Sequence, residues 1–225
     1  MTEQNIRFAV ADKGDVSGIL LRPDNAECLL VMAHGAGAGM NHSFMAAMAG
    51  ELAAVRVATL RFQFLYMEQR RKIPDHATVL TATVFAAVQA ASTAAPDLPL
   101  FAGGKSLGGR MTALAAAQRT LSDVRGLVFF GFPLHPPGQP GTKRAERLGE
   151  VKLPMLFLQG TRDKLADLNL LRPICAELGA RATLHIIETA DHSFHVLKSS
   201  GKTDADVLHE VARTARIWTQ KVLRQ

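Results

Sequence analysis

Two glycines flank a serine at Gly104, Ser106 and Gly108, which together form the pattern G-x-S-x-G. An apolar run precedes the pattern, and an alanine-rich, helix-forming stretch follows it. In such a strand-to-helix turn the serine backbone is strained, and glycine at the flanking positions avoids collisions with neighbouring backbone. The hydroxyl then lies at a helix N-terminus, where free N–H groups favour developing negative charge. We predict that Ser106 is a nucleophile; the alternative is a turn whose serine only caps the helix.

A serine hydroxyl is a weak nucleophile near neutral pH, so a histidine must accept its proton and an acid must orient that histidine. For this motif the chain order is serine, acid, histidine. Asp163 follows an apolar run in the loop Gln159-Gly-Thr-Arg-Asp163, and His192 follows the next apolar run. Because the carboxyl ends of parallel strands share one edge of a sheet, we expect Ser106, Asp163 and His192 to meet there.

Three aspartates near His192 compete for the orienting role. Asp167 stands directly before the helical stretch that begins at Leu168, where aspartate is a favourable N-cap. Asp191 is adjacent to His192, and neighbouring side chains in an extended loop diverge. We therefore predict that Asp163 orients His192.

An oxyanion hole requires two backbone N–H groups, one from the residue after the nucleophile and one from the loop after the first parallel strand. Leu107 supplies the first N–H group. For the second we choose Ala36, in the loop His34-Gly-Ala-Gly-Ala-Gly39. The alternative is that these glycines only permit a tight turn, which we expect at Gly37 and Gly39. We expect His34 to brace this loop.

Two nucleotide-binding motifs fail on spacing. Gly104-Lys-Ser106 resembles the end of a phosphate-binding loop, but Pro99 stands where that motif requires glycine. Gly35-Ala-Gly37 begins a dinucleotide fingerprint, but Met40 stands where its third glycine or alanine belongs. The two cysteines, Cys28 and Cys175, lie in apolar segments and are too few for a cysteine zinc site. We therefore expect no cofactor and no metal.

Continuously apolar runs alternate with helical patterns, which is typical of an α/β protein with a mostly parallel, doubly wound sheet. The short runs Ile6 to Val10 and Val16 to Leu21 are joined by a glycine-bearing turn and should form an antiparallel hairpin. We predict about eight strands in all. The remaining strands are expected at 28–33, 56–61, 98–102, 124–130, 153–158 and 182–188, and the helices at 43–54, 75–94, 107–120, 167–178 and 204–223.

A Pro- and Gly-rich excursion runs from Pro133 to Glu150. It is too short and too rich in proline to form a helical lid domain, so we expect a loop that rims an open site. No composition shift marks a linker, and we treat residues 1–225 as one domain.

The net charge of +6 comes from basic residues that are scattered apart from Arg70-Arg71-Lys72 and Lys143-Arg144. With one Trp, one Tyr and no interleaving of aromatic and basic residues, the sequence offers no stacking platform for nucleic acid. The N-terminal segment is polar, and no stretch approaches the roughly 18 uninterrupted apolar residues of a typical membrane span. We expect a soluble, cytoplasmic protein that binds neither nucleic acid nor membranes; the sequence makes no prediction of its oligomeric state.

Six blocks in order over residues 28–195 resemble the small α/β-hydrolases related to dienelactone hydrolase. More narrowly, they resemble the branch named after a testis-expressed protein and a subunit of a histone acetyltransferase regulatory complex. The blocks are His34 to Met40, Thr59 to Phe62, Gly104 to Met111, Phe132 to Pro137, Gln159 to Asp163, and Asp191-His192.

The resemblance implies an α/β-hydrolase fold without a lid, with Ser106, Asp163 and His192 in the triad positions. This sequence has Ser106 where dienelactone hydrolase has cysteine, so that enzyme's specificity does not transfer. Together with the residues, the resemblance predicts a serine hydrolase of small carboxylic esters or thioesters that forms an acyl-enzyme.

Some members of the same branch are complex subunits without an established hydrolytic substrate. The alternative is therefore a binding or scaffold protein that keeps the fold and the triad. Basic residues expected near the mouth of the site could favour acidic acyl groups or could be surface salt-bridge partners. These residues are Arg61, Lys105, Arg110 and Arg144.

Overall fold

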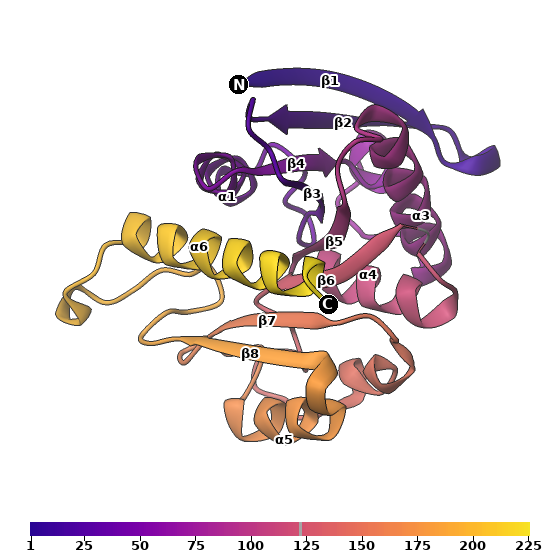
Figure 1. The fold of residues 1–225 in the computed structure, drawn as a ribbon. Coiled ribbons are helices and arrows are strands. Elements are labelled where there is room, and N and C mark those ends of the chain that lie inside the picture. Colours follow the sequence, from indigo (N-terminus) through magenta and orange to yellow (C-terminus); the bar gives the residue numbers. More distant parts are fainter. Residues whose placement is uncertain (122) are drawn as a thin grey trace.

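The computed structural model describes residues 1–121 and 123–225 and contains an open, eight-stranded sheet (Figure 1). The strand order is β1-β2-β4-β3-β5-β6-β7-β8, and β3 to β8 are mutually parallel. The strands are β1 (Thr2–Ala9), β2 (Asp15–Arg22), β3 (Cys28–Ala33), β4 (Val57–Phe62), β5 (Leu100–Lys105), β6 (Val124–Phe130), β7 (Met155–Gly160) and β8 (Ala182–Ile187). The predicted fold class is confirmed.

The N-terminal hairpin forms one edge of the sheet. β1 and β2 pair antiparallel, with Ala9 opposite Asp15, and Gly14 in the connecting turn has φ = 112°. A side chain would be strained at that φ, which accounts for glycine at this position. β2 then pairs antiparallel with β4, so the hairpin extends the parallel part of the sheet.

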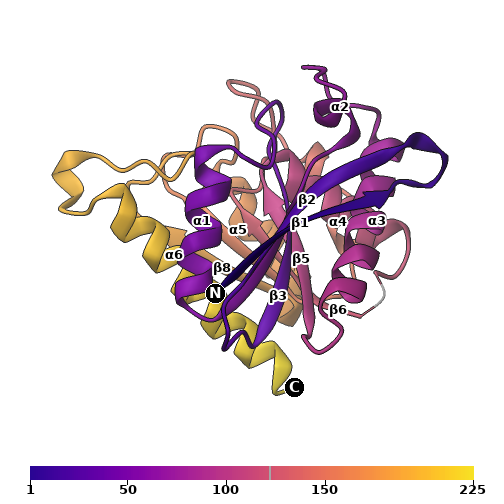
Figure 2. The same ribbon diagram turned by 90° about the horizontal axis from the view of Figure 1, so that it is seen from above.

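Helices cover both faces of the sheet, which explains why its central strands are apolar throughout (Figures 1 and 2). On β6, Leu127 and Phe129 pack into one hydrophobic cluster and Val128 and Phe130 into the other. The helices of one face are α1 (Ser43–Ala54) and α6 (Asp204–Leu223), and those of the other are α3 (Ala77–Ala94), α4 (Leu107–Gln118) and α5 (Leu168–Leu178).

Helix α3 has the length and composition of a membrane span, and its packing accounts for that apolar character. Leu80, Val84 and Ala87 are buried in the core cluster that α3 shares with the sheet. We therefore interpret α3 as a core helix.

No helical lid covers the carboxyl edge of the sheet between β6 and β7. Residues 131–154, all of which the structure describes, contain only two short 3-10 turns, Lys143–Ala145 and Leu148–Glu150. The prediction of a loop in place of a lid is therefore confirmed. A short helix that the periodicity did not predict, α2 (Leu65–Glu68), follows β4 at the same edge (Figure 2).

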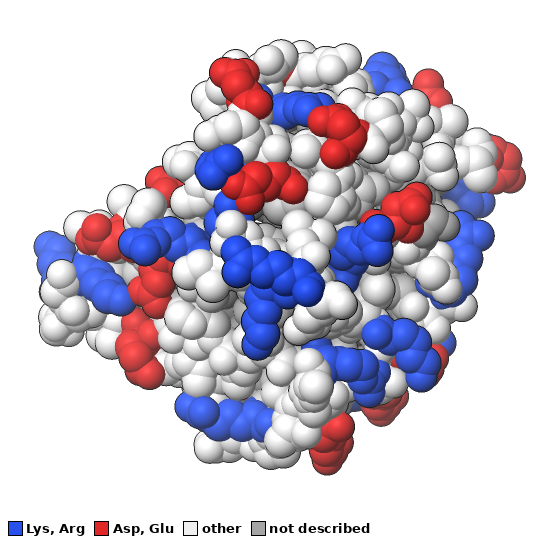
Figure 3. Space-filling model, viewed as in Figure 1, with Lys and Arg blue, Asp and Glu red and all other residues white. Residues whose placement is uncertain are grey.

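Charges of both signs share the face seen in Figure 1. Figure 3 shows Lys and Arg side chains spread over this face between Asp and Glu side chains. Ion pairs on the protein surface include that of Arg22 with Asp97.

Candidate active site

The three predicted reactive residues follow three strands of the sheet. Ser106 comes directly after β5, Asp163 lies three residues beyond β7, and His192 lies in the loop after β8. Because these strands are parallel, their carboxyl ends lie at one edge, where ligands bind in open α/β sheets.

The backbone at Ser106 has φ = 52° and ψ = −115°, a conformation that non-glycine residues rarely adopt. The turn is packed against the end of β3. A Cβ atom on Gly104 would lie 2.1 Å from the Ala33 carbonyl oxygen, and one on Gly108 would lie 2.2 Å from it. Only glycine fits at either position, as the G-x-S-x-G pattern predicts.

A chain of hydrogen bonds joins the three side chains. The Nε2 atom of His192 lies 2.9 Å from the Ser106 Oγ, and its Nδ1 atom lies 2.7 Å from the Asp163 Oδ2. The Asp163 side chain is fully buried, whereas the imidazole is 24% exposed. The base can therefore meet a substrate while the acid stays shielded from water.

Asp163 is held by further donors. Its Oδ2 also accepts a hydrogen bond from the Gln159 Nε2 at 2.5 Å, and its Oδ1 accepts one from the Leu165 N–H at 2.8 Å. Both carboxylate oxygens are thus aimed by neighbouring groups. Sequence reasoning missed Gln159, although it lies four residues before Asp163 in the same motif block.

The other two aspartates make local hydrogen bonds. Asp167 caps α5 by accepting from the Asn169 N–H at 2.8 Å. Asp191 accepts from the Ser193 N–H at 2.8 Å and the His195 N–H at 3.0 Å, which shapes the loop around His192. Neither carboxylate bonds to the His192 imidazole.

The predicted oxyanion loop lies against the nucleophile turn. A Cβ atom on Gly35 would lie 3.8 Å from the Ser106 Cβ. Leu107 is the first residue of α4, where an N–H has no acceptor within the helix. Ala36 is exposed, and its N–H donates no hydrogen bond within the described part of the chain. Gly37 and Gly39 have φ values of 68° and 77°, in keeping with their expected role in a tight turn.

His34 is buried and uses both ring nitrogens within the protein. Its Nδ1 donates to the Gly35 carbonyl oxygen at 2.7 Å, and its Nε2 accepts from the Phe64 N–H at 3.2 Å. Burial lowers the pKa of His34 to about 4, so the ring is neutral near pH 7. These bonds tie the loop after β3 to the segment after β4, which is the bracing that we expected.

Lys105 lies at the variable position before Ser106 and supports the loop that carries His192. Its buried Nζ donates a hydrogen bond to the His192 carbonyl oxygen and lies 5.6 Å and 5.4 Å from the ring centroids of Phe44 and Phe194. Burial lowers the pKa of Lys105 to about 8, although the charges of Asp163 and Asp191 oppose this shift. Sequence reasoning placed Lys105 at the mouth; its side chain points into the protein instead.

Lys105→Met tests this support. We expect kcat/KM for an ester to fall on the order of 10- to 100-fold, because loss of the anchor displaces the imidazole. Between pH 8 and 10.5, Lys105 binds more protons in the unfolded protein than in the folded protein. The free energy of unfolding of the wild type should therefore increase with pH in this window, relative to that of the variant. The slope is at most about 1.4 kcal/mol per pH unit, measured by urea unfolding across that window. If the difference in free energy of unfolding between wild type and variant did not change with pH, and the variant kept full activity, Lys105 would not position His192.

Arg61 also lies inside the protein and not at the mouth. Its side chain is only 6% exposed, and its guanidinium donates to the Met40 carbonyl oxygen at 3.2 Å, which secures the end of the loop after β3. Of the four basic residues considered, Arg110 and Arg144 remain accessible, and both line a cavity beside α4. The expectation for Arg61 and Lys105 is therefore corrected.

Cys28 and Cys175 are buried, and burial raises the pKa of each thiol to about 11. Both thiols are therefore protonated near pH 7. Within residues 1–121 and 123–225, no group of three or more His, Cys, Asp or Glu side chains is arranged to hold a metal ion.

The fold resembles several solved hydrolases over nearly the whole chain. A dienelactone hydrolase from Anabaena variabilis is 23% identical with a TM-score of 0.75, and the alignment covers 98% of this chain and 97% of that one. An α/β serine hydrolase without a lid from Xanthomonas campestris is 18% identical with a TM-score of 0.75, covering 97% and 95%. Est1E from Butyrivibrio proteoclasticus is 15% identical with a TM-score of 0.72, and the alignment covers 98% of this chain and 99% of that one. Residues 26–220 match the family model described as an alpha/beta hydrolase domain, and the chain belongs to that family.

Proposed function

We propose that this chain is a serine hydrolase of small carboxylic esters or thioesters, in which Ser106, His192 and Asp163 form the catalytic triad. The family and its esterase and serine hydrolase neighbours support hydrolysis in general. The observation that carries the finer proposal is the hydrogen-bond chain from the Ser106 Oγ through His192 to the buried Asp163. We also propose that residues 1–225 form a single domain.

The geometry suits acyl transfer through a covalent intermediate. The Ser106 Oγ attacks the substrate carbonyl carbon while the His192 Nε2 takes its proton. The N–H groups of Leu107 and Ala36 stabilise the oxyanion. His192 then protonates the leaving oxygen or sulfur as its bond to the acyl carbon breaks. Water, deprotonated by His192, releases the acyl group from Ser106 and restores the enzyme.

A binding or scaffold protein that retains the triad is the alternative. The strained φ of Ser106 favours the hydrolase, since such a conformation costs about 1–3 kcal/mol and serves to present the hydroxyl. The buried Asp163 adds to this argument, because its three hydrogen bonds aim a carboxylate at an imidazole, which a scaffold does not require. A small ester or thioester is accordingly the proposed partner, in the cytoplasm, without a role for nucleic acid or membranes.

Fluorophosphonate labelling tests the proposal. We expect the Ser106 Oγ to attack the phosphorus and expel fluoride, because an activated serine beside an oxyanion hole is unusually nucleophilic. Mass spectrometry of the digested protein should place the adduct on the peptide that contains Ser106. Labelling should be lost in Ser106→Ala and retained in Ser193→Ala, which changes an exposed serine beside His192. A folded wild-type protein that stays unlabelled would favour the scaffold alternative.

A further inference from the structure

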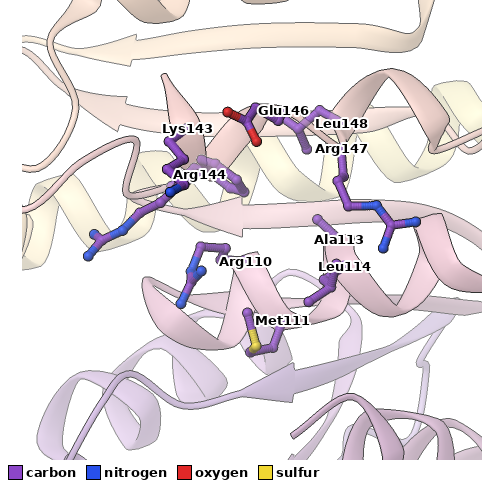
Figure 4. A pocket seen from close by; sticks show the side chains of 10 residues that line it. Arg110, Met111, Ala113, Leu114, Lys143, Arg144, Glu146, Arg147 and Leu148 are labelled. Carbon is purple, nitrogen blue, oxygen red and sulfur yellow. The ribbon is translucent and has the colours of Figure 1, made fainter. Parts of the chain in front are cut away.

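A cavity of about 440 Å³ lies between α4 and the loop that follows β6. One wall is α4, which begins directly after Ser106, and the other is formed by residues between Lys143 and Leu148 (Figure 4). Phe132 also lines the cavity. Its volume is in the usual range for small-molecule sites. Arg110 stands on α4 one turn beyond Ser106, since its N–H donates to the Ser106 carbonyl oxygen at 3.1 Å.

Cationic groups gather at the end of the cavity nearest the start of α4. Figure 4 shows Arg110 on one wall and Lys143 and Arg144 on the other, all on the same side of the cavity. Within the part of the chain that the structure describes, neither the Arg110 nor the Arg144 guanidinium forms a hydrogen bond or an ion pair. By contrast, Arg147 at the other end is paired with Glu150 at 3.0 Å. Two arginines thus face the cavity without a protein anion.

The charges of the lining leave this end of the cavity positive. Glu146 is the one acidic residue among those that line it, and it lies apart from Arg110 at the top of the view in Figure 4. Burial, and secondarily the charge of Arg144, lowers the pKa of Arg110. A ligand anion between the two guanidiniums would relieve this repulsion, and the planar fork of arginine suits a carboxylate.

The position of the cavity selects the acyl side of an ester. The leaving group must lie near the His192 Nε2 to receive its proton, and the oxyanion must lie near the loop after β3. The cavity is lined by neither of these loops but by α4, Phe132 and residues 143–148. The carbonyl carbon carries the oxygen, the leaving group and the acyl chain. Since the first two lie near other loops, the acyl chain is the substituent that enters this cavity. The apolar lining from Met111, Leu114 and Leu148 suits a methylene chain.

We propose that this cavity is an acyl-binding subsite for substrates whose acyl chain ends in an anionic group, such as the monoesters of short dicarboxylic acids, held by Arg110 and Arg144. The inference rests on the proposed function for its reaction and names the acyl class that this site prefers. Lys143, which is exposed at the rim, adds positive potential at the entrance.

Matched substrates test the subsite. We expect kcat/KM for the p-nitrophenyl monoester of glutaric acid to exceed that for p-nitrophenyl valerate at least tenfold, because the acyl chains differ in the terminal carboxylate. The ratio should fall about tenfold in Arg110→Gln and in Arg144→Gln. The ratio should stay unchanged in Arg172→Gln, because Arg172 is an exposed residue of α5 that does not line the cavity. Added salt should lower the ratio by screening.

A second pair of substrates separates the acyl side from the leaving-group side. 4-Acetoxybenzoate carries its anion on the leaving group, and its methyl ester is the neutral control. We expect no advantage for the anion in this pair. A preference for 4-acetoxybenzoate that Arg144→Gln removes would overturn the acyl assignment, and equal rates for the glutaryl and valeryl esters would overturn the subsite while leaving the hydrolase intact.

Binding to Ser106→Ala protein gives a readout that does not depend on turnover. By calorimetry, monomethyl glutarate should bind at least tenfold more tightly than dimethyl glutarate, and Arg144→Gln should remove the difference. If the wild-type protein showed no esterase activity, this binding result would still support the subsite, although the proposed reaction would have failed. Equal binding of the two esters by folded protein would overturn the subsite.

Discussion

Replacing Asp163 by asparagine is expected to lower kcat for ester hydrolysis on the order of 10⁴-fold, as the same change does in a chymotrypsin-type triad. The contacts of Asp163 give the reason. Its Oδ1 accepts from the Leu165 N–H, so the asparagine oxygen should keep that bond and turn its NH₂ group toward His192. The Nδ1 of His192 must then accept a hydrogen bond from the asparagine NH₂ group, so the ring hydrogen lies on Nε2. In that tautomer His192 cannot take the proton of Ser106.

Two neighbouring aspartates serve as controls for this prediction. Asp191→Asn keeps an oxygen that can accept from the Ser193 and His195 N–H groups, so activity should stay within a few-fold of wild type. Asp167→Ala removes the cap of α5 and should lower the free energy of unfolding by about 1 kcal/mol with little effect on kcat. Near-normal activity in Asp163→Asn beside a collapse in Asp191→Asn would show that the acid is wrongly assigned. Circular dichroism of each variant confirms that it is folded.

The elements that sequence patterns predicted best are those whose residues face apolar surroundings. β3, α1, β6 and α6 have the predicted bounds. β5 was predicted to end at Ala102 but continues to Lys105, since the apolar pattern ends at the glycines and lysine that carry the strand into the turn. Helix α2 has only four residues, too few for a helical period to show in the sequence.

The candidate site was predictable where a residue type and its place after a strand decide its role. Ser106, Asp163 and His192 follow this rule, and the structure brings them within hydrogen-bond distance. Lys105 and Arg61 were placed at the mouth because charged residues are seldom buried. Their burial depends on carbonyl oxygens of His192 and Met40, which come from loops distant in sequence and leave no pattern beside either residue.

We predict that packing requires glycine at position 108, beside the nucleophile. Replacing a glycine by alanine in two helices, at Gly108 and at Gly50, separates the effect of packing from that of helix propensity. In α4, the three atoms nearest to a Cβ atom on Gly108 would all be backbone atoms, the O and C atoms of Ala33 at 2.2 Å and 2.5 Å and the His34 oxygen at 2.7 Å. In α1, a Cβ atom on Gly50 would meet nothing within 4 Å. Backbone cannot swing aside as a flexible side chain can, so the helix and β3 must separate in Gly108→Ala.

Gly108→Ala should therefore lower the free energy of unfolding by about 3 kcal/mol, whereas Gly50→Ala should raise it by about 0.5–1 kcal/mol. The separation also moves the start of α4, with Ser106 and the Leu107 N–H, away from the loop that carries Ala36. A displacement of about 1 Å costs on the order of 100-fold in rate, so kcat/KM should fall at least that far in Gly108→Ala and stay unchanged in Gly50→Ala. Urea unfolding and ester hydrolysis measure the two effects. If Gly108→Ala matched Gly50→Ala in both, the close approach of α4 to the end of β3 would not be what holds the nucleophile in place.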